Sequence, residues 1–347
     1  MKIGIVGAQS AGKSTVFQAL TGLPPIVGQP EAKNRARLGQ IKVADVRLDL
    51  LESLYGSKKK IPVELTLLDF AANPKEQKPG SSLDPTLPGL IRDLDALLLV
   101  VGQFADPGPA GRAFQSLDDE LIFADFDQAE RRLERVRKDR SASDFERTTL
   151  EKLLKSLEAG SPLRLREMTA QEERIFSSFG FLSRKPAFVV INCDIDSASS
   201  DPDPADRELA TTRGLELFKL AASFESELAE LTSDEQRDLL AEAGLAAPAR
   251  DRLVTALYRR LGLITFYTAG EPEAHAWPLT AGATALEAAD RIHSDIARGF
   301  IRAEVVGFED FAALRSDAKV KEAGKLRLEG RDYVMRDGDI IHIRFKA

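Results

Sequence analysis

The feature that most constrains this chain lies at its N-terminal end, where an apolar stretch runs into a glycine-rich turn. The stretch contains Ile3, Ile5 and Val6 and is typical of a short β-strand. It is followed by Gly7-Ala8-Gln9-Ser10-Ala11-Gly12-Lys13-Ser14, which fits the pattern G-x-x-x-x-G-K-[ST]. Apolar residues at helical spacing come next, and Gly22 marks the end of the predicted helix. A strand, a loop and a helix in this order predict a phosphate-binding loop.

Each part of this loop has a chemical role in binding a nucleotide. The glycines allow backbone N–H groups to converge on an anion, and the helix N-terminus adds the positive end of its dipole. We expect Lys13 to reach the β- and γ-phosphates, the Ser14 hydroxyl to ligate Mg²⁺ and Thr15 to contact the α-phosphate. The predicted phosphate-binding residues are Gly7, Ala8, Gln9, Ser10, Ala11, Gly12, Lys13, Ser14 and Thr15.

Further apolar runs predict the strands of a sheet. They cover residues 38–43, 61–70, 95–101, 187–192 and 217–222, with helical patterns between several of them. Alternating strands and helices are typical of a three-layer α/β fold, in which ligands bind at the carboxyl ends of the strands. Asp69 and Asn192 each lie at the end of one of these runs, so we expect both to face the nucleotide, with Asp69 in the Mg²⁺ site.

The strand pattern stops between residues 115 and 184, and apolar residues recur there at helical spacing. Gly160 and Pro162 interrupt the helical stretches, which predicts an antiparallel helical hairpin inserted into the nucleotide-binding domain. Nine of the eleven residues from 130 to 140 are charged, six of them basic and three acidic. These charges fit a solvated helix face with i,i+4 pairs, which we favour, or a contact with nucleic acid.

A compact module with a different pattern follows residue 262. Residues 264–268 are typical of a strand, 285–298 of a helix, and 333–335 and 340–345 of two strands joined by a turn. The predicted division is a nucleotide-binding domain over 1–115 and 185–262, a helical insertion over 116–184 and an α+β module over 263–347.

Composition excludes several classes of protein. The formal net charge is −7, so any contact with nucleic acid needs a local basic patch. A single cysteine, Cys193, excludes an internal disulfide and a cysteine-based zinc site, and three widely spaced histidines argue against a histidine metal site. The apolar runs are too short for a membrane span and no secretory signal is visible, so we expect a cytoplasmic protein without membrane contact.

Several segments resemble the YchF / Obg-like ATPase family of P-loop GTPases, over nearly the whole chain. The similarity is strongest in L-I-T-F-Y-T-A-G, A-A-D-R-I-H-S-D, G-F-I-R-A-E-V-V and V-K-E-A-G-K-L-R-L-E-G-R-D-Y-V-M-R-D-G-D-I-I-H-I-R-F. L-I-F-A-D-F-D-Q-A-E-R-R-L is similar to the start of that family's helical insertion. The resemblance implies a P-loop G domain with an inserted helical hairpin and a C-terminal TGS-like β-grasp domain. It also implies ATP or GTP with Mg²⁺, and a ribosome or RNA partner for the hairpin and the last domain.

The segments that should sense the γ-phosphate depart from the family pattern. Alignment places Lys33 where the family has a threonine, and neither serine nor threonine occurs from residue 23 to 52. Asp69-Phe70-Ala71-Ala72 replaces D-x-A-G, so Ala72 stands at the glycine position. Asn73 follows, and its amide is a candidate for orienting the attacking water. Lys13 and Asn73 are therefore the predicted catalytic residues.

The base-recognition segment also differs from the family pattern. Asn192-Cys193-Asp194-Ile195 keeps the asparagine of N-x-x-E but has isoleucine at the acid position, which argues against strict GTP specificity. Cys193 fits a small buried hydrophobe better than a redox-sensitive thiol. The nucleotide-binding residues predicted on this side are Asn192, Ile195, Ala222 and Ser223.

Two functions are compatible with these observations. One is a slow, Mg²⁺-dependent P-loop NTPase that acts as a switch on the ribosome or in the translation or stress response. The other is a nucleotide-bound scaffold that does not hydrolyse and that binds the ribosome, RNA or a protein partner. Turnover of bound ATP distinguishes them.

Overall fold

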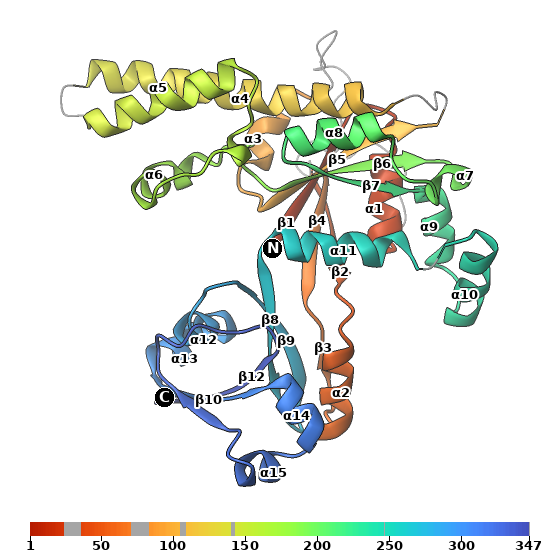
Figure 1. The fold of residues 1–347 in the computed structure, drawn as a ribbon, viewed down its shortest axis with the longest axis vertical. Coiled ribbons are helices and arrows are strands. Elements are labelled where there is room, and N and C mark those ends of the chain that lie inside the picture. Colours follow the sequence, from red (N-terminus) through yellow and green to blue (C-terminus); the bar gives the residue numbers. More distant parts are fainter. Residues whose placement is uncertain (24–35, 71–82, 105–108, 140–142, 246, 347) are drawn as a thin grey trace. The chain divides into compact units, whose positions relative to one another are not determined.

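Two separate β-sheets organise the chain in the computed structural model, which describes residues 1–23, 36–70, 83–104, 109–139, 143–245 and 247–346. One unit comprises Met1–Ile41 and Thr66–Arg252, and the other comprises Lys42–Leu65 and Leu253–Ala347 (Figure 1). The predicted phosphate-binding loop, Asp69 and Asn192 all lie in the first unit.

The sheet of the first unit has the strand order β2-β4-β1-β5-β6-β7 among the described residues. Its strands are β1 (Lys2–Gly7), β2 (Ala36–Lys42), β4 (Glu64–Phe70), β5 (Ala96–Gln103), β6 (Ala187–Cys193) and β7 (Glu216–Leu220). The pairs β1–β4, β1–β5, β5–β6 and β6–β7 are parallel. Ala96–Val101 are all buried, as expected for a parallel strand covered on both faces. The carboxyl ends of β1, β4 and β6 therefore lie at the same end of the sheet.

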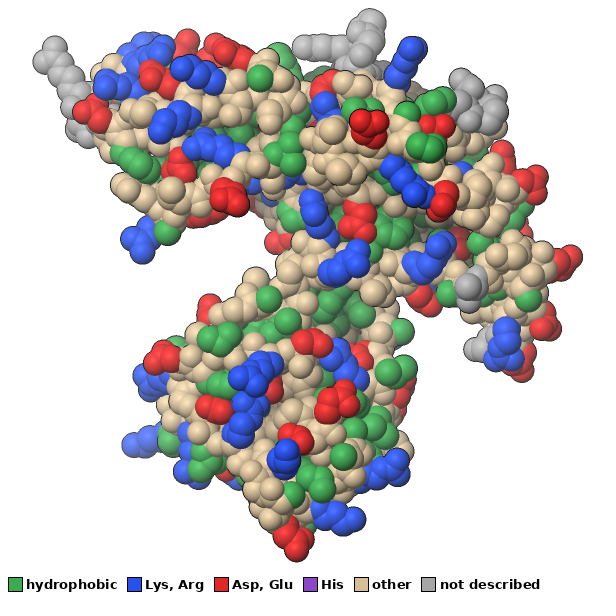
Figure 2. Space-filling view, in the orientation of Figure 1, with side chains coloured by type: hydrophobic (Ala, Val, Ile, Leu, Met, Phe, Trp, Pro, Cys, Tyr) green, Lys and Arg blue, Asp and Glu red, His purple; other side chains and the backbone are tan. Residues whose placement is uncertain are grey.

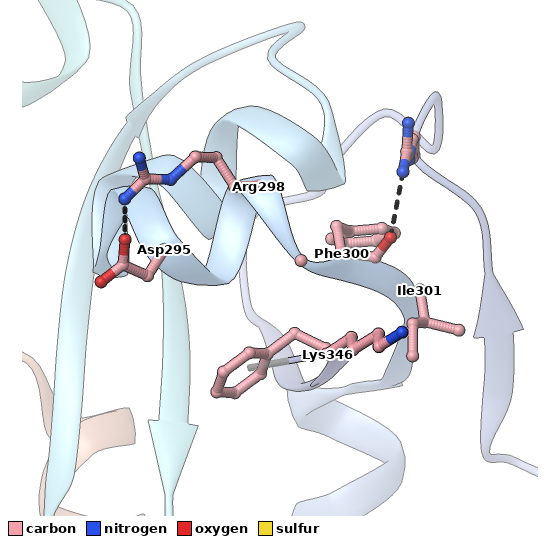
Figure 3. A pocket seen from close by; sticks show the side chains of 8 residues that line it. Asp295, Arg298, Phe300, Ile301 and Lys346 are labelled. Carbon is pink, nitrogen blue, oxygen red and sulfur yellow. Dashed lines mark hydrogen bonds and ion pairs between the residues drawn. The ribbon is translucent and has the colours of Figure 1, made fainter.

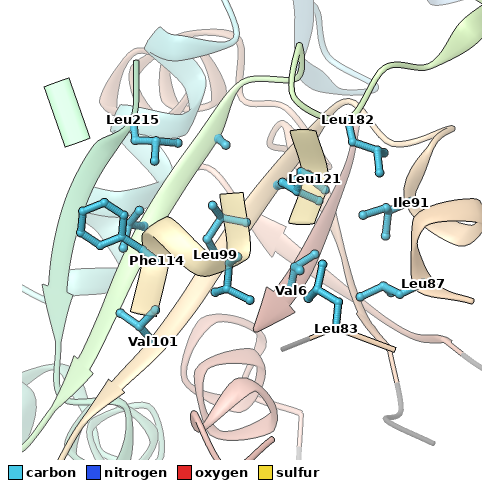
Figure 4. Close-up of a cluster of buried hydrophobic side chains, with 14 of the residues drawn as sticks. Val6, Leu83, Leu87, Ile91, Leu99, Val101, Phe114, Leu121, Leu182 and Leu215 are labelled. Carbon is cyan, nitrogen blue, oxygen red and sulfur yellow. The ribbon is translucent and has the colours of Figure 1, made fainter. Parts of the chain in front are cut away.

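Helices of the first unit pack on this sheet or on one another. They are α1 (Lys13–Thr21), α3 (Leu87–Ile91), α4 (Gly111–Lys138), α5 (Asp144–Glu158), α6 (Ala170–Phe176), α7 (Ile195–Ala198), α8 (Pro204–Thr212), α9 (Ala222–Leu228) and α10 (Ser233–Glu242). The next helix, α11 (Ala249–Arg260), belongs to the second unit from Leu253 onward, whereas the division based on sequence places residues 253–262 in the nucleotide-binding domain. Figure 4 shows one apolar cluster, in which Val6 and Leu99 of the strands lie with Phe114 and Leu121 of α4. This packing positions the ends of the strands that carry the site.

The predicted helical hairpin is formed by α4 and α5, which lie side by side (Figure 1). Leu133 and Leu150 belong to the apolar cluster between the two helices. Several arginines of the charged segment form ion pairs, namely Arg131 with Asp127, Arg132 with Glu146, and Arg137 with Glu151. These pairs favour the interpretation of a solvated helix face. In the described part of the chain, neither these helices nor any other is long and apolar enough to cross a membrane.

The second unit is built on a mixed sheet with the strand order β11-β10-β12-β8-β9-β3 in the described residues. Its strands are β3 (Lys60–Ile61), β8 (Leu263–Ala269), β9 (Ala274–Thr280), β10 (Phe300–Gly307), β11 (Arg327–Glu329) and β12 (Asp339–Phe345). Its helices are α2 (Val46–Tyr55), α12 (Ala285–Ile292), α13 (Ser294–Arg298), α14 (Phe308–Leu314) and α15 (Asp317–Glu322). Ala285 and Ala288 of α12 pack with Phe266 and Val305 of the strands. A helix packed on a mixed sheet is the predicted β-grasp arrangement.

Residues 42–65 belong to the second unit, whereas the division based on sequence places them in the nucleotide-binding domain. β3 pairs in parallel with β9. The Tyr267 hydroxyl donates to Asp45, and Arg47 forms an ion pair with Asp337 at 2.6 Å. These partners are more than two hundred positions away in sequence. A local sequence pattern therefore could not predict that the segment belongs to the second unit.

Three predicted elements differ in the structure. The run 61–70 is divided between β3 and β4. The predicted helix 285–298 is broken into α12 and α13, because His293 is extended and its Nδ1 accepts the N–H of Asp295 at 3.2 Å. Residues 333–335 form only an isolated bridge between Val334 and Thr284.

Candidate functional site

The loop between β1 and α1 has the close packing that its glycines predict. A Cβ atom at Gly7 would lie 2.3 Å from the Val100 carbonyl oxygen. Gly12 has a φ of +84°, and a Cβ atom there would lie 2.1 Å from the Asn192 side-chain nitrogen. Gly7 is therefore required because there is no space for a Cβ atom. Gly12 is required for the same reason and because its backbone conformation favours glycine.

The side chain of Lys13 is bound to the backbone of the loop. Its Nζ donates to the Gly7 carbonyl at 2.9 Å and to the Ala8 carbonyl at 2.8 Å. Burial lowers the pKa of Lys13, and the negative charge of Asp69 opposes that shift. The phosphates of a nucleotide would act in the same direction as Asp69 and keep the ammonium charged. The Lys13 ammonium is therefore held in place by the loop at the N-terminus of α1.

Ser14 and Asp69 meet where the predicted Mg²⁺ site should be. The Ser14 Oγ donates to the Asp69 Oδ2 at 3.0 Å, and Asp69 is opposite Ile5 in the β1–β4 register. Burial raises the pKa of Asp69, against the Ser14 hydrogen bond and the charge of Lys13, which lower it. No cluster of three or more His, Cys, Asp or Glu residues suited to a metal occurs among the described residues. One hydroxyl and one carboxylate suit Mg²⁺ shared with nucleotide phosphates and water.

Asn192 links the phosphate loop to the start of α9. Its Oδ1 accepts the N–H of Ala222 at 3.1 Å, and its Nδ2 donates to the Ala11 carbonyl at 3.4 Å. The side chain is 2% exposed, so these bonds satisfy a buried amide. Asn192 therefore positions two backbone segments of the predicted site. Ser223 is the next residue of α9 and its side chain is exposed.

Ile195 occupies the family's acid position with an apolar contact instead of an acceptor. It packs against the cluster of Cys193, Ala198 and Ala221, while Asp194 and Asp196 beside it are exposed. Cys193 is buried and its thiol donates to the Leu220 carbonyl at 3.8 Å. Burial raises the pKa of the Cys193 thiol, which supports the interpretation of a buried hydrophobe.

Phe104 is a residue of this site that the sequence patterns did not single out. It follows β5, it is 45% exposed, and its ring lies 3.7 Å from the Cβ position at Gly12. An exposed aromatic ring beside a phosphate loop is a suitable surface for a nucleotide base. Its position could have indicated this from the sequence, because Phe104 directly follows an apolar strand and ligands bind at the carboxyl ends of such strands.

Known proteins that are similar to this chain over its full length show the family to which it belongs. A protein of Bacillus subtilis named ribosome-binding ATPase YchF is 37% identical over 362 residues, covering 99% of this chain and 99% of that protein. The protein of the same name from Haemophilus ducreyi is 35% identical over 361 residues, covering 100% and 99%. The chain belongs to the YchF family.

Further matches agree with this membership of the YchF family. A family model for the C-terminal domain of YchF-type GTPases, described as a protein of unknown function, matches residues 263–346. The solved structure of the YchF GTPase of Schizosaccharomyces pombe is similar with a TM-score of 0.85 and 27% identity, covering 99% of this chain and 97% of that one. The predicted family and fold class are therefore confirmed.

The structure brings together only part of the predicted site of this YchF-family chain. Asp69 contacts Ser14, and Asn192 links the loop to Ala222, whereas Ile195 packs in an apolar cluster and the Ser223 side chain is exposed. The predicted switch residues Lys33, Ala72 and Asn73 lie outside the described residues, so the roles assigned to them stay predictions.

Proposed function

We propose that this chain binds a nucleoside triphosphate with Mg²⁺, hydrolyses it slowly and acts as a switch on the ribosome. The phosphate loop is the observation that carries the proposal. Lys13 is held inside the loop, and the Ser14 hydroxyl lies 3.0 Å from the Asp69 carboxylate. A cation, a hydroxyl that can ligate a metal and a carboxylate beside it would neutralise charge on a transferred phosphoryl group.

The names of the relatives support the ribosome and hydrolysis parts of this proposal. The bacterial relatives are named ribosome-binding ATPases, and the fission yeast relative is named a GTPase. We extend ribosome binding and nucleotide hydrolysis to this chain because the similarity covers its full length. A ribosome partner would place the protein in the cytoplasm.

ATP and GTP are expected to differ by less than about tenfold in affinity, or ATP is expected to bind more tightly. Ile195 cannot accept hydrogen bonds from the guanine edge, and a missing acceptor removes a few kcal/mol of discrimination. Titration calorimetry with non-hydrolysable analogues of both nucleotides and Mg²⁺ measures this. Ile195→Asp should move the preference toward GTP, and Ile195→Asn is its uncharged control. A strong GTP preference in the unmodified chain would contradict the prediction and would assign the role to Asp194 or Asp196.

Basal turnover is expected to be slow, about 10⁻⁴ to 10⁻² s⁻¹, as in unstimulated GTPases. Lys33 and Ala72 occupy the positions of the threonine and glycine that contact the γ-phosphate, and Asn73 is shorter than a catalytic glutamine. Ala72→Gly alone should not restore the rate, because the threonine is still absent. Single-turnover measurements with ATP and Mg²⁺, with chelated metal as the control, test both statements.

The same measurement tests the second candidate function, a nucleotide-bound scaffold. The altered residues at positions 33, 72 and 195 are the observation that favours it. Tight binding with no turnover above background would support the scaffold. Rapid turnover would refute both the scaffold and the slow switch, and Lys33→Ala and Asn73→Ala would then identify the working catalyst.

The last domain is the part of the chain that we propose for contact with ribosomal RNA. Arginines of the α4–α5 hairpin are largely paired with acids of the same hairpin, which weakens the case for an RNA contact there. Residues 298–347 contain eleven basic and nine acidic residues, a net charge of +2 in a chain of net charge −7. Co-sedimentation with ribosomes, with and without a non-hydrolysable triphosphate, tests the partner and its dependence on nucleotide.

A further inference from the structure

A pocket of about 730 Å³ lies at one end of β10 and β12 in the second unit (Figure 3). We call it the strand-end pocket and define it by Arg298, Ile301, Arg331, Phe345 and Lys346. Its volume is within the range of about 300–1,000 Å³ that is usual for ligand sites. It belongs to none of the nucleotide-binding machinery described above.

Apolar side chains in this pocket are open to solvent. Ile301 is 62% exposed and Phe345 is 44% exposed, whereas Phe300, the partner of Phe345 in the β10–β12 register, is 3% exposed. The β10–β12 register is irregular between Phe300 and Arg302, and this irregularity leaves both Ile301 and Arg302 on the outside. Exposed apolar side chains gathered at one place are typical of an interaction site.

The same pocket has an excess of positive charge. Among the described residues that line it, Arg298, Arg331 and Lys346 are basic and Asp295 is acidic, and Asp295 is paired with Arg298. Arg331 donates one N–H to the Phe300 carbonyl at 3.2 Å, which leaves other N–H groups of its guanidinium for a ligand. No ion pair to Lys346 occurs within the described residues, and Figure 3 shows its side chain ending beside Ile301.

Two further arginines lie on the strands that end at the pocket. Arg302 of β10 is opposite Arg344 of β12 in the register, and both share one acid, Glu304, at 3.9 and 3.0 Å. These cations point to the opposite face of the sheet from Phe345, because successive side chains of a strand alternate between faces, so they add positive charge to the module but do not line the pocket. Figure 2 shows Lys and Arg side chains interspersed with acidic and apolar ones on the visible face of the second unit.

We propose that the strand-end pocket binds single-stranded RNA. A base stacks on the exposed ring of Phe345, and the phosphates on either side are held by Lys346 and Arg331. Stacking on an exposed aromatic ring together with a cationic path for the backbone is how proteins bind single strands. An acidic peptide would use the cations but would leave the aromatic face without a planar partner. This inference rests on the proposed function, because ribosomal RNA is the strand that it would contact.

Binding of a short, fluorescein-labelled oligouridine to the full chain, followed by anisotropy, tests the proposal. Phe345→Ala should weaken binding about 5- to 150-fold, and Phe345→Trp should keep it. Lys346→Gln should reduce the slope of log affinity against log salt by about 0.7, the value for one lost phosphate contact. Leu328→Ala, at an exposed leucine of β11, and Lys321→Gln, at an exposed lysine of α15, are matched controls that should change neither quantity.

Each other outcome overturns the proposal. Equal affinity of Phe345→Ala and the unmodified chain would show that no base stacks there. Uridine monophosphate that competes as well as the oligouridine would indicate a mononucleotide pocket instead. Loss of ribosome binding in Phe345→Ala without any oligouridine binding would indicate a protein partner. Normal triphosphate binding and thermal unfolding in the variants exclude misfolding.

The proposed function fails separately from this inference. If the unmodified chain binds oligouridine through Phe345 but does not sediment with ribosomes, RNA binding by the pocket is supported and the proposed ribosome partner is refuted. If Phe345→Ala and Lys346→Gln sediment with ribosomes and bind oligouridine like the unmodified chain, RNA binding by the pocket is refuted. The proposed function is then unaffected.

Discussion

Lys13→Ala is expected to weaken triphosphate binding by about 10- to 150-fold, because hydrogen bonds to a charged group are worth about 1.5–3 kcal/mol. The Lys13 ammonium is held at 2.9 and 2.8 Å from two loop carbonyls, at the position from which it would reach the β- and γ-phosphates. The backbone N–H groups of the loop remain in the variant. We therefore expect weakened binding rather than unfolding.

Calorimetry with a non-hydrolysable triphosphate and Mg²⁺ measures this loss. The corresponding diphosphate should lose less affinity, because it lacks the γ-phosphate that Lys13 contacts. Lys42→Ala, at an exposed lysine in β2, is the matched control and should bind both ligands normally. Unchanged triphosphate affinity in Lys13→Ala would show that the loop does not carry the nucleotide.

Asp125→Ala is expected to destabilise the first unit by about 3–5 kcal/mol, since it removes one partner of a buried, charged network. Asp125 of α4 is fully buried and accepts the N–H groups of Leu182 and Ser183 at 2.9 and 2.7 Å. It also accepts the Ser183 hydroxyl at 2.7 Å and pairs with Arg92 at 3.3 Å. The variant removes the acceptor of the Leu182 and Ser183 groups, which are buried at the junction between the helical hairpin and the residues that lead into β6.

Urea unfolding followed by far-ultraviolet circular dichroism measures the change in unfolding free energy. Asp127→Ala is the matched control, because Asp127 lies on the same helix and makes an exposed i,i+4 pair with Arg131. Its loss should cost less than about 0.5 kcal/mol. Ser183→Ala should cost about 2–3 kcal/mol, because its hydroxyl donates to the charged Asp125 and accepts the N–H of Leu163. An Asp125→Ala variant as stable as Asp127→Ala would show that the junction is held by apolar packing alone.

The nucleotide site could be predicted from sequence where its chemistry is local. Gly7, Gly12, Lys13 and Ser14 lie within one short segment, and the strand and helix around them are readable from apolar spacing. The fold class and the helical hairpin followed from periodicity in the same way, since side chains three or four residues apart share a helix face. The switch positions 33, 72 and 73 could be named only from the family pattern, and they remain predictions.

Errors in the predicted elements arose where a tertiary contact outweighs a local preference. Residues 285–298 have the apolar spacing of one helix, but the extended His293 caps a second helix instead. The run 61–70 has the composition of one strand, but Lys60–Ile61 pairs with β9 in the second unit. Periodicity describes which face of an element is apolar, and it does not describe which other element covers that face.

The sequence by itself determined the phosphate loop, the α/β class and the family, because each depends on residues close together in the chain or on long matching segments. Only the tertiary structure decided that Asn192 joins Ala11 to Ala222 and that Phe104 lies over Gly12. It also decided that residues 42–65 belong to the second unit and that Ile301, Phe345 and Lys346 line one pocket. The physical reason is that these contacts join residues from different elements, whose pairing depends on how the whole chain buries its apolar surface.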